Sequence, residues 1–339
     1  MPKSIIVILL SLCTSMGNFS FGQDPSFSQF FSSPLNINPA LTANISADWR
    51  TILNMRNQWL APASPYATGT ISFDTKLFQR KIANVEEDNF VGMGAMMMFD
   101  YAMGGIVKST YASLNLSYNI KLTEWPATQR LAAGFGLTYA SRHIDFKGLN
   151  FQEQYTGSGF NTNLPTGESA LSNMKPYLSA SVGLTYTYAT ENSNVDIGMA
   201  AFHVNKPRQT FLEDENQRLP IRKVAHANFD TYLNDHLILN ANMIYQSQLA
   251  ASYFSVGGAL GYDLGTEEKV IVNGGLWYWS NNALVPYFGF SYKEFQVGVS
   301  YDLTTSKLAQ ASRRPSTWEL SIILRGVRSS SRSIPCPWK

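Results

Sequence analysis

A strict alternation of apolar and polar residues, sustained over about ten positions at a time, recurs along this chain. In its first occurrence, Leu53 and Met55 alternate with Asn54 and Arg56. Side chains of a β-strand point alternately to its two faces, so this period of two predicts a strand with one apolar and one polar face. Strands of globular proteins usually have about five or six residues, whereas a strand that crosses an outer membrane has about 9–11. The length of the alternation therefore favours membrane-spanning strands.

About fourteen stretches follow this pattern. In chain order they are 47–59, 67–77, 91–101, 112–121, 131–139, 178–188, 195–203, 223–233, 237–245, 254–264, 270–278, 284–292, 295–303 and 318–324. Lipid cannot satisfy exposed backbone N–H and C=O groups, so spanning strands must close into a barrel, and bacterial barrels have an even number of strands. The sequence therefore predicts an all-β fold, a transmembrane antiparallel β-barrel of about 14 strands in a bacterial outer membrane.

Composition favours the barrel over its main competitor, a soluble β-sandwich adhesin or lectin, whose strands alternate in the same way. Charged residues make up only 15% of the chain, whereas average usage is about 25%. Tyrosine and tryptophan gather near the ends of the expected strands, as at Trp59, Tyr101, Tyr139 and Tyr278. Aromatic girdles at the two membrane interfaces of a barrel predict this placement.

The chain divides into four expected segments. Residues 1–22 have a basic start, an apolar run too short to span a membrane and a polar, small-residue end, which is the order of a secretory signal peptide. Residues 23–46 lack strand alternation and are expected to be a periplasmic N-terminal segment, 47–326 the transmembrane β-barrel, and 327–339 a C-terminal tail. Because the strand number is even, we expect both termini on the periplasmic side.

The connections between the expected strands differ in length. Short polar turns occur at 234–235, 265–268 and 280–282, and long connections at 79–89, 143–175 and 205–220. Barrels of this kind have short periplasmic turns and long external loops. The connection 143–175 is rich in glycine, asparagine, threonine and serine, and it carries the aromatic residues Phe146, Phe151, Tyr155 and Phe160. It is long enough to fold over the barrel mouth.

No constellation of residues for catalysis, metal binding or a cofactor emerges from the sequence. The histidines lack a second ligand at metal spacing: His143, His203, His226 and His236. Gly92-Met93-Gly94 lacks the third glycine of a phosphate-binding loop. Cys336 is the one cysteine outside the expected signal peptide, and a net charge of +2 gives no reason to expect nucleic acid. We therefore expect a protein that is not an enzyme and that holds no cofactor or metal.

Charged residues of both signs occupy polar-face positions of the first two expected strands: Asp48, Arg50, Arg56 and Asp74. In a barrel this face lines the lumen. Opposite charges at such positions can pair with one another, which would narrow or plug the channel.

The segment 23–43 combines prolines, which force extended or turn backbone before them, with apolar residues that must be buried somewhere. Our hypothesis is that it docks on or inside the periplasmic mouth of the barrel, or holds a periplasmic partner. The residues expected to bind are Asp24, Pro25, Phe27, Phe30, Asn38 and Pro39. A flexible leader is the alternative, because chain termini are often disordered.

Two blocks at the start of the expected mature chain resemble a known family. QDPSFSQF at 23–30 and PLNINPAL at 34–41 are similar to the mature N-terminus of the PorP/SprF family, outer-membrane proteins of the type IX secretion system of Bacteroidetes. Similarity continues to the end of the chain at NMRNQW (54–59), SFD (72–74), FHVNKP (202–207), GVSYD (298–302), WELS (318–321) and IPCP (334–337). Trp318 stands where the family usually has histidine.

The resemblance implies a role in secretion or surface attachment, with no catalytic residues to carry over. The resemblance implies that this protein is the dedicated partner of a large secreted surface adhesin of the gliding-motility type. The partners implied for this chain are outer-membrane lipid, a large secreted surface protein and other type IX secretion components. The alternative is a general diffusion porin or small-solute outer-membrane transporter, which has no reason to carry the N-terminal block or the Pro-Cys-Pro tail.

Overall fold

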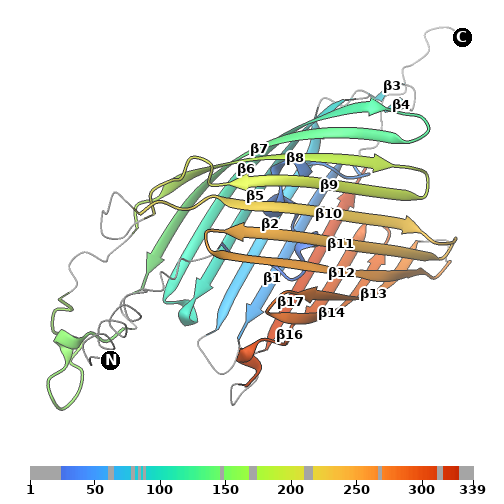
Figure 1. The fold of residues 1–339 in the computed structure, drawn as a ribbon. Coiled ribbons are helices and arrows are strands. Elements are labelled where there is room, and N and C mark those ends of the chain that lie inside the picture. The colour runs from blue at the N-terminus through green and yellow to red at the C-terminus, as the bar shows by residue number, and fades with distance from the viewer. Residues whose placement is uncertain are drawn as a thin grey trace, which may run out of the picture.

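The strands of this protein close into one barrel. The computed structural model describes residues 24–59, 65–77, 81–82, 85–86, 89–145, 149–167, 174–209, 217–265, 269–310 and 316–327. Within these residues, fourteen antiparallel strands form a closed ring around a central lumen (Figure 1). The prediction of an all-β barrel of about 14 strands is confirmed.

Each expected stretch of alternation corresponds to one strand of the ring. The strands are β1 (Trp49–Gln58), β2 (Tyr66–Leu77), β5 (Phe90–Ala102), β6 (Val107–Thr123), β7 (Thr128–Ile144), β8 (Tyr177–Ala189), β9 (Ser193–Phe202), β10 (Arg222–Tyr232), β11 (Leu237–Gln248), β12 (Ala251–Asp263), β13 (Val270–Trp279), β14 (Ala283–Tyr292), β15 (Phe295–Tyr301) and β17 (Thr317–Gly326). The short β16 (Leu303–Thr304) pairs with β14 and continues β15 beyond a break at Asp302.

Minor elements lie outside the ring. The connection after β2 carries a small hairpin of β3 (Lys81–Ile82) and β4 (Val85–Glu86). Short 3-10 turns occur at η3 (Met103–Gly105), η5 (Gln152–Gln154) and η6 (Lys307–Gln310). Among the described residues, no helix has the length and the apolar content needed to cross a membrane.

The ring has no free edge strand. Consecutive strands pair with each other, and β1 closes the ring by pairing with β17. This seam extends from Trp49 opposite Gly326 to Gln58 opposite Thr317. Closure is what a membrane requires, because lipid cannot hydrogen-bond the exposed backbone of an edge strand.

The two faces of the wall are sorted by polarity. On β6, Leu114 is 60% exposed, whereas its neighbours Ser113 and Asn115 are 6% and 3% exposed. Large apolar side chains dominate the outer face around the ring, and serine, threonine, asparagine and charged side chains are buried on the inner face. An apolar outer face suits lipid, and a polar inner face suits the lumen of an outer-membrane barrel.

The ring has two different ends. The long-loop end carries the connections 145–176, 203–221 and 305–316, and at the opposite short-turn end β1 begins and β17 ends. We expect the short turns at one end of the barrel and the long connections at the other. Two connections differ: the long connection 79–89 lies at the short-turn end, and the short turn 280–282 lies at the long-loop end. Antiparallel strands reverse direction at every connection, so position in the strand order assigns the end and length does not.

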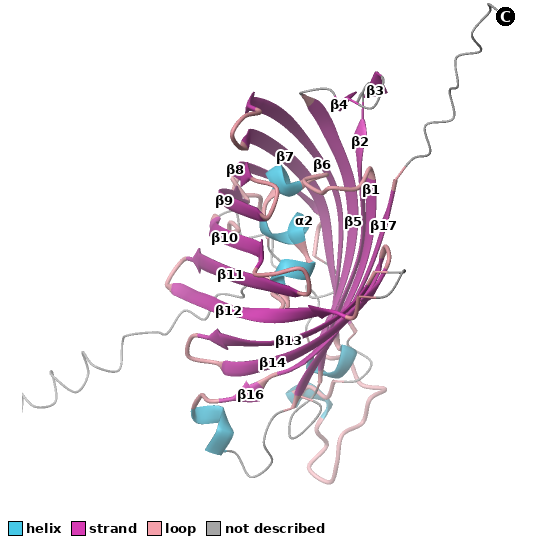
Figure 2. Ribbon diagram, turned by 90° about the vertical axis from the view of Figure 1, so that its right-hand side faces the viewer, coloured by secondary structure: helices cyan, strands magenta, loops and turns pink. Residues whose placement is uncertain are grey.

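The N-terminal segment lies in the lumen. Residues 24–48, which we call the plug, contain η1 (Phe30–Ser32), α2 (Pro34–Ile37) and η2 (Pro39–Leu41). Figure 2 shows α2 inside the ring of strands. Proline occupies the first helical position of α2 and of η2, where its missing N–H costs nothing.

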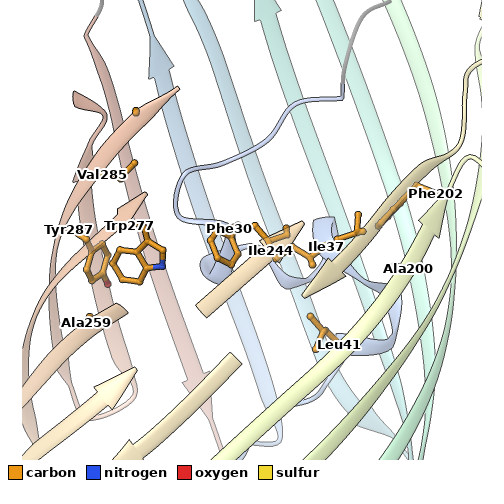
Figure 3. Packing of buried hydrophobic residues seen from close by; sticks show 12 residues of the cluster. Phe30, Ile37, Leu41, Ala200, Phe202, Ile244, Ala259, Trp277, Val285 and Tyr287 are labelled. Atoms are coloured by element: carbon orange, nitrogen blue, oxygen red, sulfur yellow. The ribbon is translucent and has the colours of Figure 1, made fainter. Parts of the chain in front are cut away.

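The plug and the inner wall share a hydrophobic core (Figure 3). Phe30, Ile37 and Leu41 of the plug pack against one sector of the wall, whose members are Ala200, Phe202, Val224, Ile244, Ala259, Trp277, Ala283, Val285 and Tyr287. The Phe31 ring stacks on Trp277 with 4.6 Å between centroids. Burying a phenylalanine, isoleucine or leucine side chain stabilises by about 1.5–3 kcal/mol, so these contacts attach the plug firmly.

The plug runs through the barrel from one end to the other. Asp24 contacts His203 and Arg222 at the long-loop end, whereas Asp48 leads directly into β1 at the short-turn end. The first described residue and the end of β17 therefore lie at opposite ends. The expectation that both termini are periplasmic stays a prediction, because residues 1–23 and 328–339 lie outside the described part of the chain.

An even strand number places the start of β1 and the end of β17 at one end of the ring, whereas the described segment before β1 crosses the lumen to the other end. The segment expected to be periplasmic thus lies inside the barrel over its described part, 24–46. The expected signal peptide, 1–22, lies outside the described residues, as do 328–339 of the expected tail.

Candidate functional site

Glu319 on β17 accepts hydrogen bonds from the backbone of the plug. One of its carboxylate oxygens accepts the N–H of Ser28 and the other accepts the N–H of Gln29, both at 2.7 Å. The Arg56 guanidinium on β1 lies against Glu319 and 2.9 Å from the Asp302 carboxylate. These three charged side chains are at most 4% exposed. Buried charges need partners, and the plug supplies part of the pairing here.

The side chains of the same dipeptide are held as well. Gln29 Nε2 donates to Ser300 Oγ at 3.0 Å, and Gln29 Oε1 accepts from Ser321 Oγ at 2.8 Å. Arg56 Nη1 donates to Ser28 Oγ at 2.7 Å. Three strands that are neighbours in the ring, β1, β15 and β17, therefore converge on two residues of the plug.

Asn38 anchors the middle of the plug to the opposite wall. Its side-chain nitrogen lies 3.0 Å from the Leu184 carbonyl oxygen, 3.1 Å from Thr185 Oγ1 and 3.1 Å from His226 Nε2. Its side-chain oxygen accepts the N–H of Ala40 at 2.8 Å, which caps η2. Asn38 is fully buried, and the partners of its amide nitrogen share the two hydrogens on that atom, which replaces the bonds to water that burial removes.

An ion pair fixes the plug near the point where it becomes β1. Arg50 and Asp74 face each other in a bidentate arrangement, with Nε–Oδ1 and Nη2–Oδ2 distances of 3.0 Å and 2.6 Å. Asp74 Oδ2 also accepts the N–H of Ala43 at 2.8 Å. A charge-assisted pair of this kind is geometrically specific, so it sets where the segment turns.

Asp24 secures the other end of the plug. Its Oδ2 lies 2.7 Å from His203 Nε2 and 3.2 Å from Arg222 Nε, and its backbone N–H donates to Gln248 at 3.2 Å. Burial alone would raise the pKa of the Asp24 carboxyl, but the charge of Arg222 and the hydrogen bond from His203 lower the pKa to about 2. The carboxyl is therefore ionised at neutral pH and its pairing with Arg222 persists.

Glycines on β7 and β8 let the plug approach the wall. A Cβ built on Gly134 would overlap backbone atoms of Pro39 and Ala40, and one built on Gly183 would overlap the side chain of Asn38. Glycine has no side chain, so the wall leaves room at these two positions for the backbone of η2. A larger residue at either position would push η2 off the wall. This sector of the lumen therefore fits the plug in its present position.

Loop residues cover the lumen at the long-loop end. Met174 and Leu219, from the connections after β7 and β9, belong to a second hydrophobic cluster with Met98, Tyr111, Ala140 and Tyr177. In the connection 149–167, Tyr155 and Phe160 form an isolated bridge with ring centroids 5.2 Å apart. These two side chains are 55% and 53% exposed, so the long-loop end presents aromatic surface.

The structure places the candidate residues within the plug and on the inner wall. The six expected to bind a partner all belong to the plug: Asp24, Pro25, Phe27, Phe30, Asn38 and Pro39. The four expected lumen charges are buried on the inner side: Asp48, Arg50, Arg56 and Asp74. Binding of another protein by the plug residues stays a prediction. Within the described chain, no group of three or more His, Cys, Asp or Glu side chains could hold a metal ion.

Sequence reasoning misses two strong contacts of the plug, made by Glu319 and Asp302. Each falls in a stretch that carries the family resemblance, WELS or GVSYD. The position of Glu319 opposite Arg56 in the polar pattern is the signal that could find it, because a charge in the lumen wall needs a partner.

Several outer-membrane barrels of known structure match this chain. The Pseudomonas putida toluene transporter TodX is 10% identical, with a TM-score of 0.48 over 86% of this chain and 93% of that one. The Ralstonia pickettii toluene transporter TbuX is 13% identical, with 0.47 over 87% and 94%. The translocator domain of the autotransporter NalP from Neisseria meningitidis is 9% identical, with 0.36 over 84% and 90%. None of the curated proteins matches this chain.

A closed barrel with an apolar outer face and a lumen filled by its own N-terminal segment defines a class, the outer-membrane β-barrel with a plugged bore. The type IX secretion system membrane protein PorP/SprF family matches residues 19–324 of this chain. The chain therefore belongs to the PorP/SprF family and is an outer-membrane component of type IX secretion. The resemblance noted in the sequence is confirmed.

Proposed function

We propose that this protein supports the secretion or cell-surface attachment of a partner adhesin of the gliding-motility type, and that it acts at its long-loop end. The observation that carries the proposal is the plug. Residues 24–48 occupy the bore and are tied to the wall by buried charges on β1, β2 and β17. A lumen in this state has no room for a protein substrate, so recognition falls to the exposed loops.

The long-loop end has features of a protein-binding surface. Its exposed Tyr155 and Phe160 are of a residue type enriched in protein interfaces. The loop that carries them is ordered by its own bonds, from Asn161 N–H to the Gln154 carbonyl at 2.8 Å and from Gln154 Nε2 to the Leu164 carbonyl at 3.0 Å. An ordered loop loses little conformational entropy on binding, which favours affinity.

Replacement of this loop tests the proposal. Exchanging 151–164 for a Gly/Ser linker of equal length should abolish display of the adhesin on intact cells, while the barrel still shows heat-modifiable gel migration. The matched control exchanges 79–88 at the short-turn end in the same way. Unchanged display in the first variant, or an equal loss in the control, would refute a role of the long-loop end.

The alternative is a general diffusion porin or small-solute transporter. In planar bilayers we expect little conductance from the intact protein and the steady conductance of an open barrel from a variant that lacks 24–46. Solute-selective conductance of the intact protein would favour the alternative, because it would require an open route beside the plug.

The periplasmic role expected for 23–43 is kept as a separate proposal. While the segment lies in the lumen, a partner reaches it only at the ends of the barrel or after its release. Its deletion should leave an assembled barrel that no longer supports surface display of the adhesin. Unchanged display after this deletion would exclude the role.

A further inference from the structure

A cavity of about 590 Å³ lies between the plug and the wall. Its lining includes Lys269, Lys293 and Val327, which lie at the ends of β13, β14 and β17, so its mouth is at the short-turn end. We call it the vestibule. Its volume is within the range of about 300–1,000 Å³ that is typical of ligand pockets.

The floor of the vestibule is aromatic and apolar. Phe31 stacks on Trp277, and the Tyr287 ring stands edge-on to Phe31 with 5.5 Å between centroids. Ile37 and Leu41 of the plug complete the floor. Figure 3 shows Trp277 and Tyr287 side by side on the wall that faces the plug. Such a floor accepts an apolar or aromatic group.

The described chain ends at the lining of this cavity. Val327 is the last described residue and lines the vestibule. Residues 328–339 follow it, and twelve residues can extend by at most about 40 Å. The end of β17 therefore delivers a segment of sufficient length to the mouth of the vestibule.

The composition of that segment matches the pocket. Its sequence at 334–338 is Ile-Pro-Cys-Pro-Trp. Proline-rich segments bind aromatic-lined grooves.

We propose that the vestibule is the docking site of the chain's own segment 334–338, with Trp338 and the two prolines on the aromatic floor. The lumen is then occupied from both sides, by the plug and by the tail. The inference does not depend on which adhesin the protein serves or on the loops of the other end.

Cross-linking tests the proposal in the full-length protein, since Cys336 lies inside the docking segment. Asn273→Cys places a second thiol on the vestibule wall, and Glu124→Cys places one in an exposed turn at the same end, outside the vestibule. After mild oxidation of folded protein, we expect an intramolecular disulfide with Asn273→Cys at several times the yield with Glu124→Cys. Equal yields would show a tail that samples the whole end of the barrel, and would overturn the proposal.

A second measurement leaves the barrel wall unchanged. Trp338→Ala removes the largest apolar group of the segment, whose burial contributes more than the free energy of a tenfold change in an equilibrium. We expect Cys336 to react with a bulky maleimide about tenfold faster in this variant than in the otherwise native protein. Equal rates would contradict docking. A larger adduct formed by Asn273→Cys in a Cys336→Ser background in native membranes would assign the vestibule to another protein, and would overturn the proposal too.

Discussion

Arg56 on β1 and Glu319 on β17 are register partners across the seam that closes the ring, and together they hold the plug. Glu319 accepts two backbone N–H groups of the plug, and Arg56 donates to Ser28 Oγ. One pair of charges therefore joins the first and last strands of the barrel to the segment inside it. The same contact therefore lies at the seam of the ring and at the seat of the plug.

Glu319→Ala should release the plug at this level. The substitution leaves Arg56 buried beside Asp302 alone and removes both acceptors of the plug backbone, and breaking a buried pair costs about 3–5 kcal/mol. We expect a lower temperature for the loss of heat-modifiable migration, and bursts of bilayer conductance. Glu319→Gln is the matched control and should lose less, because its side-chain oxygen still accepts one N–H. Silent bilayers and an unchanged transition in Glu319→Ala would contradict this account.

Gly134→Ala tests the close fit of the plug. The added methyl group would overlap the backbone of Pro39 and Ala40, and overpacking of this kind costs about 1–3 kcal/mol. We expect faster proteolysis within the plug of detergent-solubilised protein. The control is Gly274→Ala, whose Cβ would meet nothing within 4 Å. Equal proteolysis of the two variants would mean that η2 is not pressed against β7.

The strands could be predicted because the environment imposes the pattern. Lipid selects apolar side chains at every outward position, and the lumen admits polar ones, as Leu114 between Ser113 and Asn115 illustrates. The strand ends were less predictable. β7 extends from Thr128 to Ile144, beyond the expected 131–139, because hydrogen bonding continues past the region where lipid enforces alternation.

The path of the plug could not be predicted in the same way. The burial of Phe27 and Phe30 follows from their apolar character, but no periodic pattern says which surface covers them. Their cover consists of strands far away in the chain, and the anchoring charges Glu319 and Asp302 lie more than 270 residues beyond them. Closure of the ring brings these distant residues into contact, so the sequence pattern alone does not predict the contacts.

Leu114→Arg tests the assignment of the outer face. Leu114 lies near the middle of β6 and is 60% exposed on the apolar side, and an arginine at the bilayer midplane costs about 2–4 kcal/mol. We expect a matching loss in the free energy of folding into lipid vesicles, measured by denaturant titration. Leu164→Arg, in a loop of the long-loop end, should change this free energy by less than about 0.5 kcal/mol. Similar losses in both variants would place Leu114 away from lipid.

The direction of the plug gives the last prediction. Asp24 is held by Arg222 and Gln248 at the long-loop end, so an epitope tag inserted directly before Asp24 should emerge there. On intact cells this tag should be bound by antibody to the same extent as a tag inserted at 157–159. A tag in the turn 124–126 at the short-turn end should be bound only after the outer membrane is opened. Should the tag before Asp24 behave like the one at 124–126, the segment would enter from the short-turn end, and the contacts of Asp24 with Arg222 and His203 could not form.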